Sequence, residues 1–436
     1  MGLYERIDGF FGLTRQGTNF TNEAHGALIT FLSVIYMMSV VPSILSEAGM
    51  NEGHAFTATV IITIVGCLLM GLFANYPMCQ GPALGLCTFL TYTIVKGMGY
   101  TWQEALAAMF VSSVIFVFVS FTGIRQKILD SMPHGVRISI GMGVGAYIAY
   151  VGLVNSGIIL RDPVTVFAIG DLTSSFVITA IFCIIVTLVL HFLKIKSAVF
   201  LGMAAAIVFG LIIGSVTLPD TLVDTPVMPD MFAFIHGFDE GFFNIQMVGI
   251  IFCLAVMQFF EGTASIFAVS DVLEEQDNDN DINKALKADS AAAAASSIVD
   301  ISPTVPYVES VVGVTAGSRT GLTAVLIAIM MAFALFLGPL FMVIGYQCTV
   351  GAMFIIGIST MAGFRKLDKH DIPSILTAVT MVVTMIVSYS IAIGLSLGFI
   401  VYFASMILSG RRKELGPLIY VLTIILGAYF VLEMFI

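Results

Sequence analysis

Long runs of hydrophobic residues, separated by short polar stretches, dominate this chain. A helix needs about 20 mostly apolar residues to cross the hydrocarbon core of a bilayer. The pattern therefore predicts crossing helices at residues 27–45, 56–73, 105–122, 138–154, 174–192 and 198–216. After a polar loop it predicts further apolar helices at 246–270, 288–299, 321–337, 350–362, 372–408 and 416–435. The expected structure is an all-α polytopic membrane protein.

Two apolar stretches, Pro82–Val95 and Ser302–Thr320, are interrupted by proline and glycine. They occupy matching positions in the two halves of the chain, which is typical of inverted repeats whose binding site lies where the interrupted segments meet. Pro82 and Pro306 suit a first helical turn, where a missing N–H costs nothing. We therefore expect two half-helices whose positive ends point into the protein.

The composition supports membrane residence and limits the partners. Hydrophobic residues make up 58% of the chain and charged residues 11%, whereas about a quarter of a soluble domain is charged. A net charge of −10 argues against nucleic acid as a partner. The six cysteines are scattered without a CxxC pair, so we interpret them as small hydrophobic residues and expect no metal site. The lipid bilayer is the expected environment.

Positively charged loops predict the orientation, because Lys and Arg accumulate on the cytoplasmic side. Loops 47–53 and 217–244 contain no Lys or Arg, so they are expected outside and the N-terminus inside. Residues 411–413 are also expected inside, which requires 372–408 to be a helical hairpin. If 372–408 is instead one broken span, both termini lie inside. The charges that mark the cytoplasmic side are Arg125, Lys127, Arg137, Lys194, Lys196, Lys284, Lys287, Arg365, Lys366 and Lys369.

Two glutamates lie in apolar segments, where a charge is costly and usually functional. Glu261 shares a helix face with Gln258, Gly262 and Ser265 at the spacing i−3, i+1 and i+4. This stripe is either a seam between helices or the wall of a site. We expect Glu261 and Glu309 to form one substrate site.

Several segments are similar to one family of transporters. The stretch YVESVVGVTAGSRTGLTAV resembles the signature of the azaguanine-type purine permeases, within the nucleobase:cation symporter group, which share the fold of uracil and xanthine permeases. Other segments in family order are TFLSVIYMMSVVPSILSEAGM, GMGYTWQEALAAMF and GMGVGAYIAYVGLVNSGI. The resemblance implies a fold of about fourteen segments in two inverted sevens, with a core domain that moves against a gate domain.

The resemblance also implies the domain boundaries. Residues 1–26 form a cytoplasmic N-terminus and 217–245 an extracellular loop. The core comprises 27–122 and 246–337, and the gate comprises 123–216 and 338–436. A homodimer through the gate is implied by resemblance to the wider group.

By position, Glu309 matches the family's glutamate in the tenth segment and Glu261 its acidic residue in the eighth. The chain departs from the family at Gln258, where an aspartate is usual, and at Cys87, where an asparagine is usual. The predicted substrate-binding residues are Glu261, Glu309, Gln258, Cys87, Ser265, Phe260 and Ser310.

The expected activity is uptake of nucleobases, above all purines such as guanine, hypoxanthine or adenine, coupled to protons. Two carboxylates in one dry pocket do not both ionise cheaply, so we expect Glu309, with Glu261 as its partner, to carry the proton. No cofactor other than the coupling proton is expected. Alternatives are another planar heterocycle such as xanthine or uracil, a small anion, or a membrane-embedded enzyme.

Overall fold

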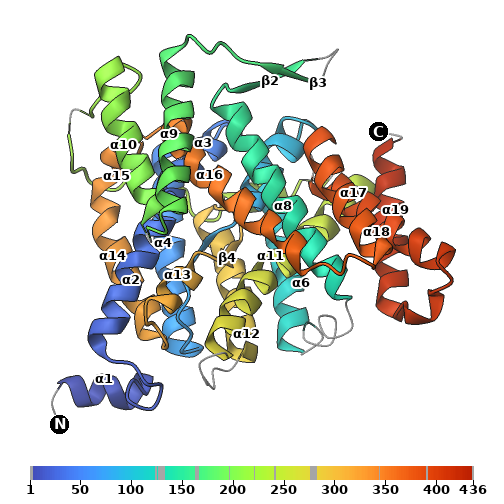
Figure 1. Cartoon of the computed structure of the whole chain (residues 1–436), viewed down its shortest axis with the longest axis horizontal. Coiled ribbons are helices and arrows are strands. Elements are labelled where there is room, and N and C mark those ends of the chain that lie inside the picture. The colour runs from blue at the N-terminus through green and yellow to red at the C-terminus, as the bar shows by residue number, and fades with distance from the viewer. Residues whose placement is uncertain are drawn as a thin grey trace.

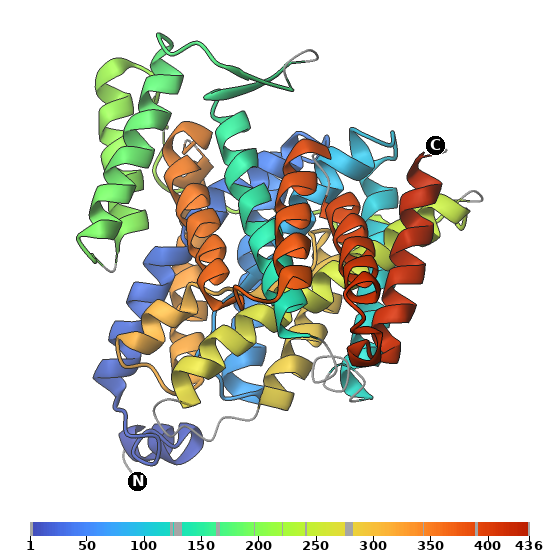
Figure 2. The ribbon, with the colours of Figure 1, turned by 45° about the vertical axis from the view of Figure 1, so that its right-hand side comes forward.

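The computed structural model describes residues 3–122, 125, 133–162, 166–195, 197–219, 221–239, 242–274, 282–342, 344–388 and 391–434. Within these residues, eight helices are long and apolar enough to cross a membrane. The N-terminal helix α1 (Leu3–Phe11) lies at one end of the helix bundle, whereas the last described helix ends at the opposite side (Figures 1 and 2). The chain is a multi-pass membrane protein of the predicted class.

The core domain combines the first four segments of each half of the chain. In the first half these are α2 (Phe20–Val34) with α3 (Met37–Ser46), α4 (Glu52–Leu68), α5 (Leu84–Thr88) and α6 (Trp102–Phe121); a π-helical turn extends α4 to Phe73 and another extends α5 to Val95. In the second half they are α11 (Ile245–Glu274), α12 (Ile282–Ser296), α13 (Ser310–Thr315) and α14 (Leu322–Ala334) with α15 (Gly338–Met342).

The gate domain contains three segments that follow the core segments in each half, and the second half adds α19 (Pro417–Met434). These are α8 (His134–Asn155), α9 (Ser175–Phe192) and α10 (Ala198–Ile213), then α16 (Tyr346–Met361), α17 (Ile372–Ser388) and α18 (Ile391–Leu408). Helix α8 packs on α16 and α17, and α16 packs in turn on α8 and α9. This reciprocal packing is the signature of the inverted repeat. Helix α19 follows α18 and packs against it.

The two interrupted segments meet in a short antiparallel ladder. Strand β1 (Gln80–Pro82) pairs with β4 (Thr304–Pro306), with Gly81 opposite Val305. The N–H of Tyr307 donates to the carbonyl of Cys79 at 2.8 Å and extends the pairing. Unpaired backbone at membrane depth costs several kcal/mol per group, so each interrupted segment supplies the partner that the other lacks.

The ladder corrects one prediction from the sequence. Neither proline begins a helix: Pro82 ends β1, two residues before α5 starts at Leu84, and Pro306 ends β4, four residues before α13 starts at Ser310. Proline suits this terminal ladder position because it has no N–H to donate. The pairing of the two interrupted segments was not predicted, nor was the hairpin of β2 (Ile159–Asp162) and β3 (Val166–Ile169).

The structure settles the open question about residues 372–408. Helices α17 and α18 pack side by side, and Arg411, just after α18, forms an ion pair with Asp371, just before α17. The beginning of α17 and the end of α18 therefore lie at the same face, as a hairpin requires. Helix α19 then runs back toward the opposite face (Figure 2).

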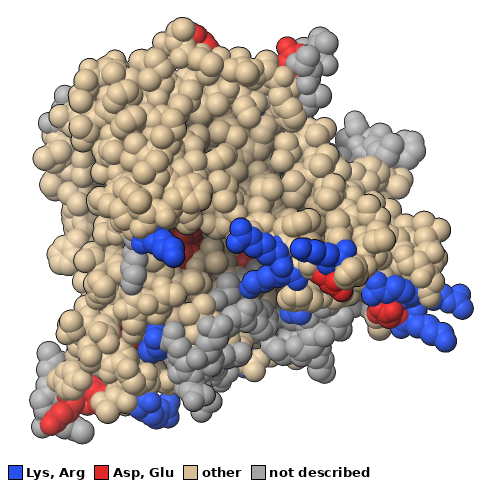
Figure 3. Space-filling model, viewed as in Figure 1, with Lys and Arg blue, Asp and Glu red and all other residues tan. Residues whose placement is uncertain are grey.

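Lys and Arg side chains gather in a band across the lower half of the molecule (Figure 3). We call this side the basic face. The starts of α8 and α12 and the end of α16, with the 3₁₀ helix that follows it, lie on it (Figure 2), and these segments carry Arg137, Lys284, Lys287 and Lys366. Arg125 differs from the expectation of a solvated loop charge, because its side chain is buried. Lys127 and Lys196 lie outside the described residues.

Helices of the core approach one another through glycines. A Cβ atom at Gly71 would lie 2.6 Å from the carbonyl oxygen of Gly321, so α4 and α14 touch through their backbones. Added atoms in a tightly packed contact typically cost about 1–3 kcal/mol.

We predict that Gly71→Ala destabilises the protein by about 1–3 kcal/mol, because the new methyl group forces α4 and α14 apart. The apparent melting temperature in detergent measures the effect. Gly427→Ala on α19 is the matched control, since the nearest atom to its Cβ lies 3.8 Å away, at ordinary contact distance. Equal melting temperatures for the two variants would contradict the packing argument.

Candidate functional site

A cavity of about 470 Å³ lies between the core and the gate. The core contributes Glu261, Ser265, Tyr307 and Glu309 to its wall. The gate contributes one face of α8, which is apolar or glycine over the depth of the cavity: Ile138, Gly141, Val144, Gly145 and Ile148. The cavity thus has a polar wall on one domain and a smooth apolar wall on the other.

The cavity opens at the basic face. Its exposed lining residues are His134, Ser359, Ala362 and Lys366, which lie at the start of α8 and around the end of α16. Deeper lining residues such as Tyr36, Leu84 and Ile148 are buried. In the described part of the chain, the two glutamates are therefore reached from the basic face.

Glu309 lies in the cavity wall, just after the end of the ladder. It directly precedes the first residue of α13, and its Oε1 accepts a hydrogen bond from the hydroxyl of Tyr36 at 3.0 Å. Tyr36 lies in the break between α2 and α3. The ladder fixes the backbone and the tyrosine fixes the carboxylate, so Glu309 is held in one position.

Glu261 reaches the same cavity from α11. The backbone of Gly85, in the first turn of α5, forms a hydrogen bond with its carboxylate. A Cβ atom at Gly85 would lie 3.1 Å from Oε2 of Glu261, so a larger residue would press on the carboxylate. The first turn of α5 and the carboxylate therefore face each other, as expected for a half-helix end.

The predicted site residues separate into two groups. Glu261, Ser265 and Glu309 line the cavity, and Ser265 donates a hydrogen bond to the carbonyl of Glu261 at 3.2 Å. The side chain of Phe260 lies outside the described part of the structure. Tyr307 lines the cavity and donates to the carbonyl of Pro82 at 2.6 Å.

Gln258 and Cys87 are buried and engaged elsewhere. The amide of Gln258 donates to Ser112 at 2.6 Å and accepts from Ser113 at 3.0 Å, which directs it toward α6. The Cys87 sulfur lies 2.9 Å from the hydroxyl of Ser302. In this conformation neither residue belongs to the cavity wall, and substrate contact by either one stays a prediction.

Ser310 has a role in the ladder. Its hydroxyl is buried and accepts a hydrogen bond from the N–H of Cys79 at 3.0 Å. It therefore ties α13 to the strand that leads into α5. Substrate contact by Ser310 likewise stays a prediction.

A buried ion pair lies next to the two strands of the ladder. Arg125 Nη2 lies 2.7 Å from Asp289 Oδ2, and both side chains are almost fully buried. Gln80 of β1 donates to Asp289 at 3.1 Å and to Thr304 of β4 at 3.1 Å. The pair is thus connected to both strands of the ladder. Gly262 leaves the room for Asp289, because a Cβ there would lie 2.5 Å from Oδ2.

Sequence reasoning missed Tyr36, Arg125 and Asp289. Asp289 could have been found by the rule that identified the glutamates, since it begins a run of small residues that packs at depth. Arg125 was interpreted as a loop charge because it follows α6 directly. Tyr36 gives no signal of its own, because its partner is 273 residues away.

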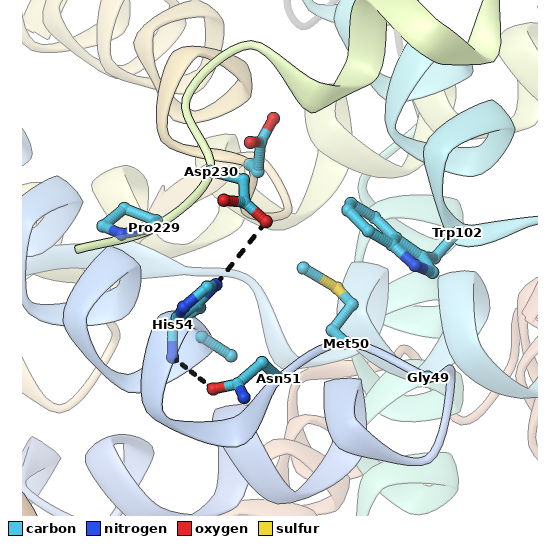
Figure 4. Close-up of a pocket in the computed structure, with 9 residues that line it drawn as sticks. Gly49, Met50, Asn51, His54, Trp102, Pro229 and Asp230 are labelled. Atoms are coloured by element: carbon cyan, nitrogen blue, oxygen red, sulfur yellow. Dashed lines mark hydrogen bonds and ion pairs between the residues drawn. The ribbon is translucent and has the colours of Figure 1, made fainter. Parts of the chain in front are cut away.

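A second, smaller cavity of about 210 Å³ lies at the face opposite the basic face. Trp102, His54 and Asp230 point into it, and His54 Nδ1 lies 3.7 Å from Asp230 Oδ2 (Figure 4). Asp300 accepts from the N–H of Ala233 at 3.0 Å, and burial raises its pKa to about 6. These contacts fasten the connection between α10 and α11 to the core.

Two inverted bundles, with a polar cavity where their half-helices cross, define a membrane transporter. A family model described as "Permease family" matches residues 22–431, and the chain belongs to this family.

Among its relatives, the guanine/hypoxanthine permease PbuG of Bacillus subtilis is 36% identical over 440 residues, covering 97% of this chain and 99% of PbuG. The adenine permease AdeP of Escherichia coli is 31% identical over 432 residues, covering 97% of this chain and 95% of AdeP.

Solved structures with the same fold have little sequence identity with this chain. The transmembrane domain of the cyanobacterium bicarbonate transporter BicA has a TM-score of 0.64 at 13% identity, covering 86% of this chain and 96% of BicA's domain. The murine Solute Carrier 26 family member A9 anion transporter in the inward-facing state has a TM-score of 0.61 at 9% identity, covering 94% of this chain and 72% of that one.

We predict that Asp289→Asn destabilises the protein by roughly 3–5 kcal/mol, because it leaves the buried guanidinium of Arg125 without a counter-charge. Melting in detergent measures the loss. The double variant Arg125→Met/Asp289→Leu should recover most of it, since both charges are then removed.

The matched control is Asp371→Asn, which weakens a partly exposed ion pair with Arg411 and leaves Arg411 its second partner, Glu414. Exposed pairs contribute about 0–1 kcal/mol. If Asp289→Asn melts no lower than Asp371→Asn, the ion pair between Arg125 and Asp289 does not stabilise the fold.

Proposed function

We propose that this protein imports purine nucleobases, such as guanine, hypoxanthine or adenine, by proton symport with alternating access. The observation that carries the proposal is the pair of carboxylates, Glu261 and Glu309, in one cavity between core and gate. The names of the relatives, which are guanine/hypoxanthine and adenine permeases, support the substrate class.

The chemistry of the cavity suits a flat base. Ring N–H groups of a purine donate to carboxylates, and a base carbonyl can accept from a backbone N–H such as those at the start of α5. The aromatic rings of Tyr36 and Tyr307 lie in the wall beside Glu309. The apolar face of α8 can cover the other side of the ring, so that the gate contributes shape and the core contributes hydrogen bonds.

The same carboxylates support proton coupling. Glu309 already accepts a hydrogen bond from Tyr36. Protonation turns one of its two carboxylate oxygens into a donor, so it changes which oxygen accepts from Tyr36 and which one contacts the base. We propose that Glu309 takes up the proton and that Glu261 keeps its bond to Gly85 throughout. Proton and base then bind together at one place.

Orientation follows from the charge of the surface. We propose that the basic face is cytoplasmic, because Lys and Arg accumulate on that side. The N-terminus is then inside, and the cavity as described is open to the cytoplasm. The C-terminus, beyond α19, is then outside.

Glu309→Gln is predicted to abolish accumulation of labelled guanine or hypoxanthine in proteoliposomes with an imposed pH gradient. The amide cannot carry the coupling proton. A protonophore should have the same effect on the unmodified protein, and removal of sodium should have none. The substrate should be recovered chemically unchanged inside the vesicles.

The matched control is Glu414→Gln, which neutralises an exposed carboxylate far from the cavity and should leave accumulation within about twofold, as expected for a surface substitution. Accumulation that survives both the protonophore and Glu309→Gln would overturn the coupling proposal.

A further inference from the structure

Three basic side chains line the mouth of the cavity. His134 and Arg137 lie in the first turn of α8, and Lys366 lies at the end of the short 3₁₀ helix Ala362–Lys366 that follows α16. All three belong to the gate, whereas the two carboxylates belong to the core. The cavity therefore has an acidic inner end and a basic outer end.

Among the described residues, these basic groups have no acidic partner. No hydrogen bond or ion pair joins His134, Arg137 or Lys366 to another side chain in the described part of the chain. The Nε atom of Arg137 is buried without a partner among the described residues. A buried N–H of a guanidinium without an acceptor is costly. His134 and Lys366 are exposed and Arg137 is half-buried, so a phosphate at the mouth can reach the ends of these side chains without contacting the buried Nε atom.

The general charge bias of the basic face does not account for this arrangement. Arg365 and Lys369 lie within three residues of Lys366 in the sequence but do not line the cavity. A neutral base needs the carboxylates alone and leaves the mouth empty. A volume of about 470 Å³ falls in the range of pockets that hold drug-sized ligands, about 300–1,000 Å³, which is more than a single base requires.

We propose that the cavity also binds purine nucleoside monophosphates from the basic face, with the base at Glu261 and Glu309 and the phosphate at His134, Arg137 and Lys366. This inference rests on the proposed function of the same site. Arg and Lys are the side chains that bind phosphate most strongly, through charge-assisted hydrogen bonds.

A nucleotide bound in this way is an inhibitor. Its phosphate bridges from the core-bound base to the gate, so the two domains cannot move past each other, and the buried inner end of the cavity offers no exit. The reaction that consumes an imported base by attaching ribose phosphate would produce this ligand. Import would then slow when the nucleotide made from the base accumulates.

The test is equilibrium binding to the purified full-length protein in neutral nanodiscs, with guanine, guanosine, guanosine 5′-monophosphate and inorganic phosphate as probes. We expect the monophosphate to compete with guanine and to bind more tightly than guanosine. In Arg137→Gln/Lys366→Gln the affinity for the monophosphate relative to guanine should fall about tenfold or more, as for loss of charged hydrogen bonds.

Lys369→Gln is the matched control and should leave that ratio unchanged. The inference is wrong if guanine binds and the monophosphate does not, or if the ratio is the same in the double variant. It is also wrong if inorganic phosphate binds equally well without displacing guanine, or if the competition disappears in nanodiscs that contain anionic lipid, which would assign the mouth to lipid headgroups. If guanine itself does not bind, the proposed function fails first.

Discussion

The constraint that the rest of the structure depends on is the need to pair backbone groups at membrane depth. Two segments that stop being helical there would each leave donors and acceptors unpaired. In this protein β1 and β4 pair with each other, and Ser310 and Tyr307 extend the pairing with their own hydrogen bonds. The ladder is therefore what permits two half-helices to begin inside the molecule.

The position of the chemistry follows from that ladder. Glu309 lies where β4 passes into α13, and the start of α5 faces Glu261. Behind them, the ion pair of Arg125 and Asp289 reaches both strands through Gln80. The core thus holds its polar groups through hydrogen bonds to the ladder and its neighbours, while the gate contributes an apolar helix face and a basic rim. Such a division suits a transporter in which one domain carries the substrate past the other.

Much of the fold could be predicted from the sequence, because crossing helices are set by the length of apolar runs. The breaks at Pro82 and Pro306 and the position of Glu261 and Glu309 at depth were also visible in the pattern. The β1–β4 pairing was not, because it joins residues more than 200 positions apart. Gln258 was expected in the pocket from its helix face, yet α6 offers two serines on that side. Helical spacing predicts which residues share a helix face, but it does not predict which other helix that face packs against.

The central claim is that the two carboxylates at the ladder bind a flat purine. The most direct measurement is equilibrium binding of guanine, hypoxanthine, adenine and uracil to the purified protein and to the double variant Glu261→Gln/Glu309→Gln. We expect saturable binding of at least one purine to the unmodified protein, and its loss in the double variant while the fold is retained. No binding of any purine, or equal binding by the double variant, would contradict it.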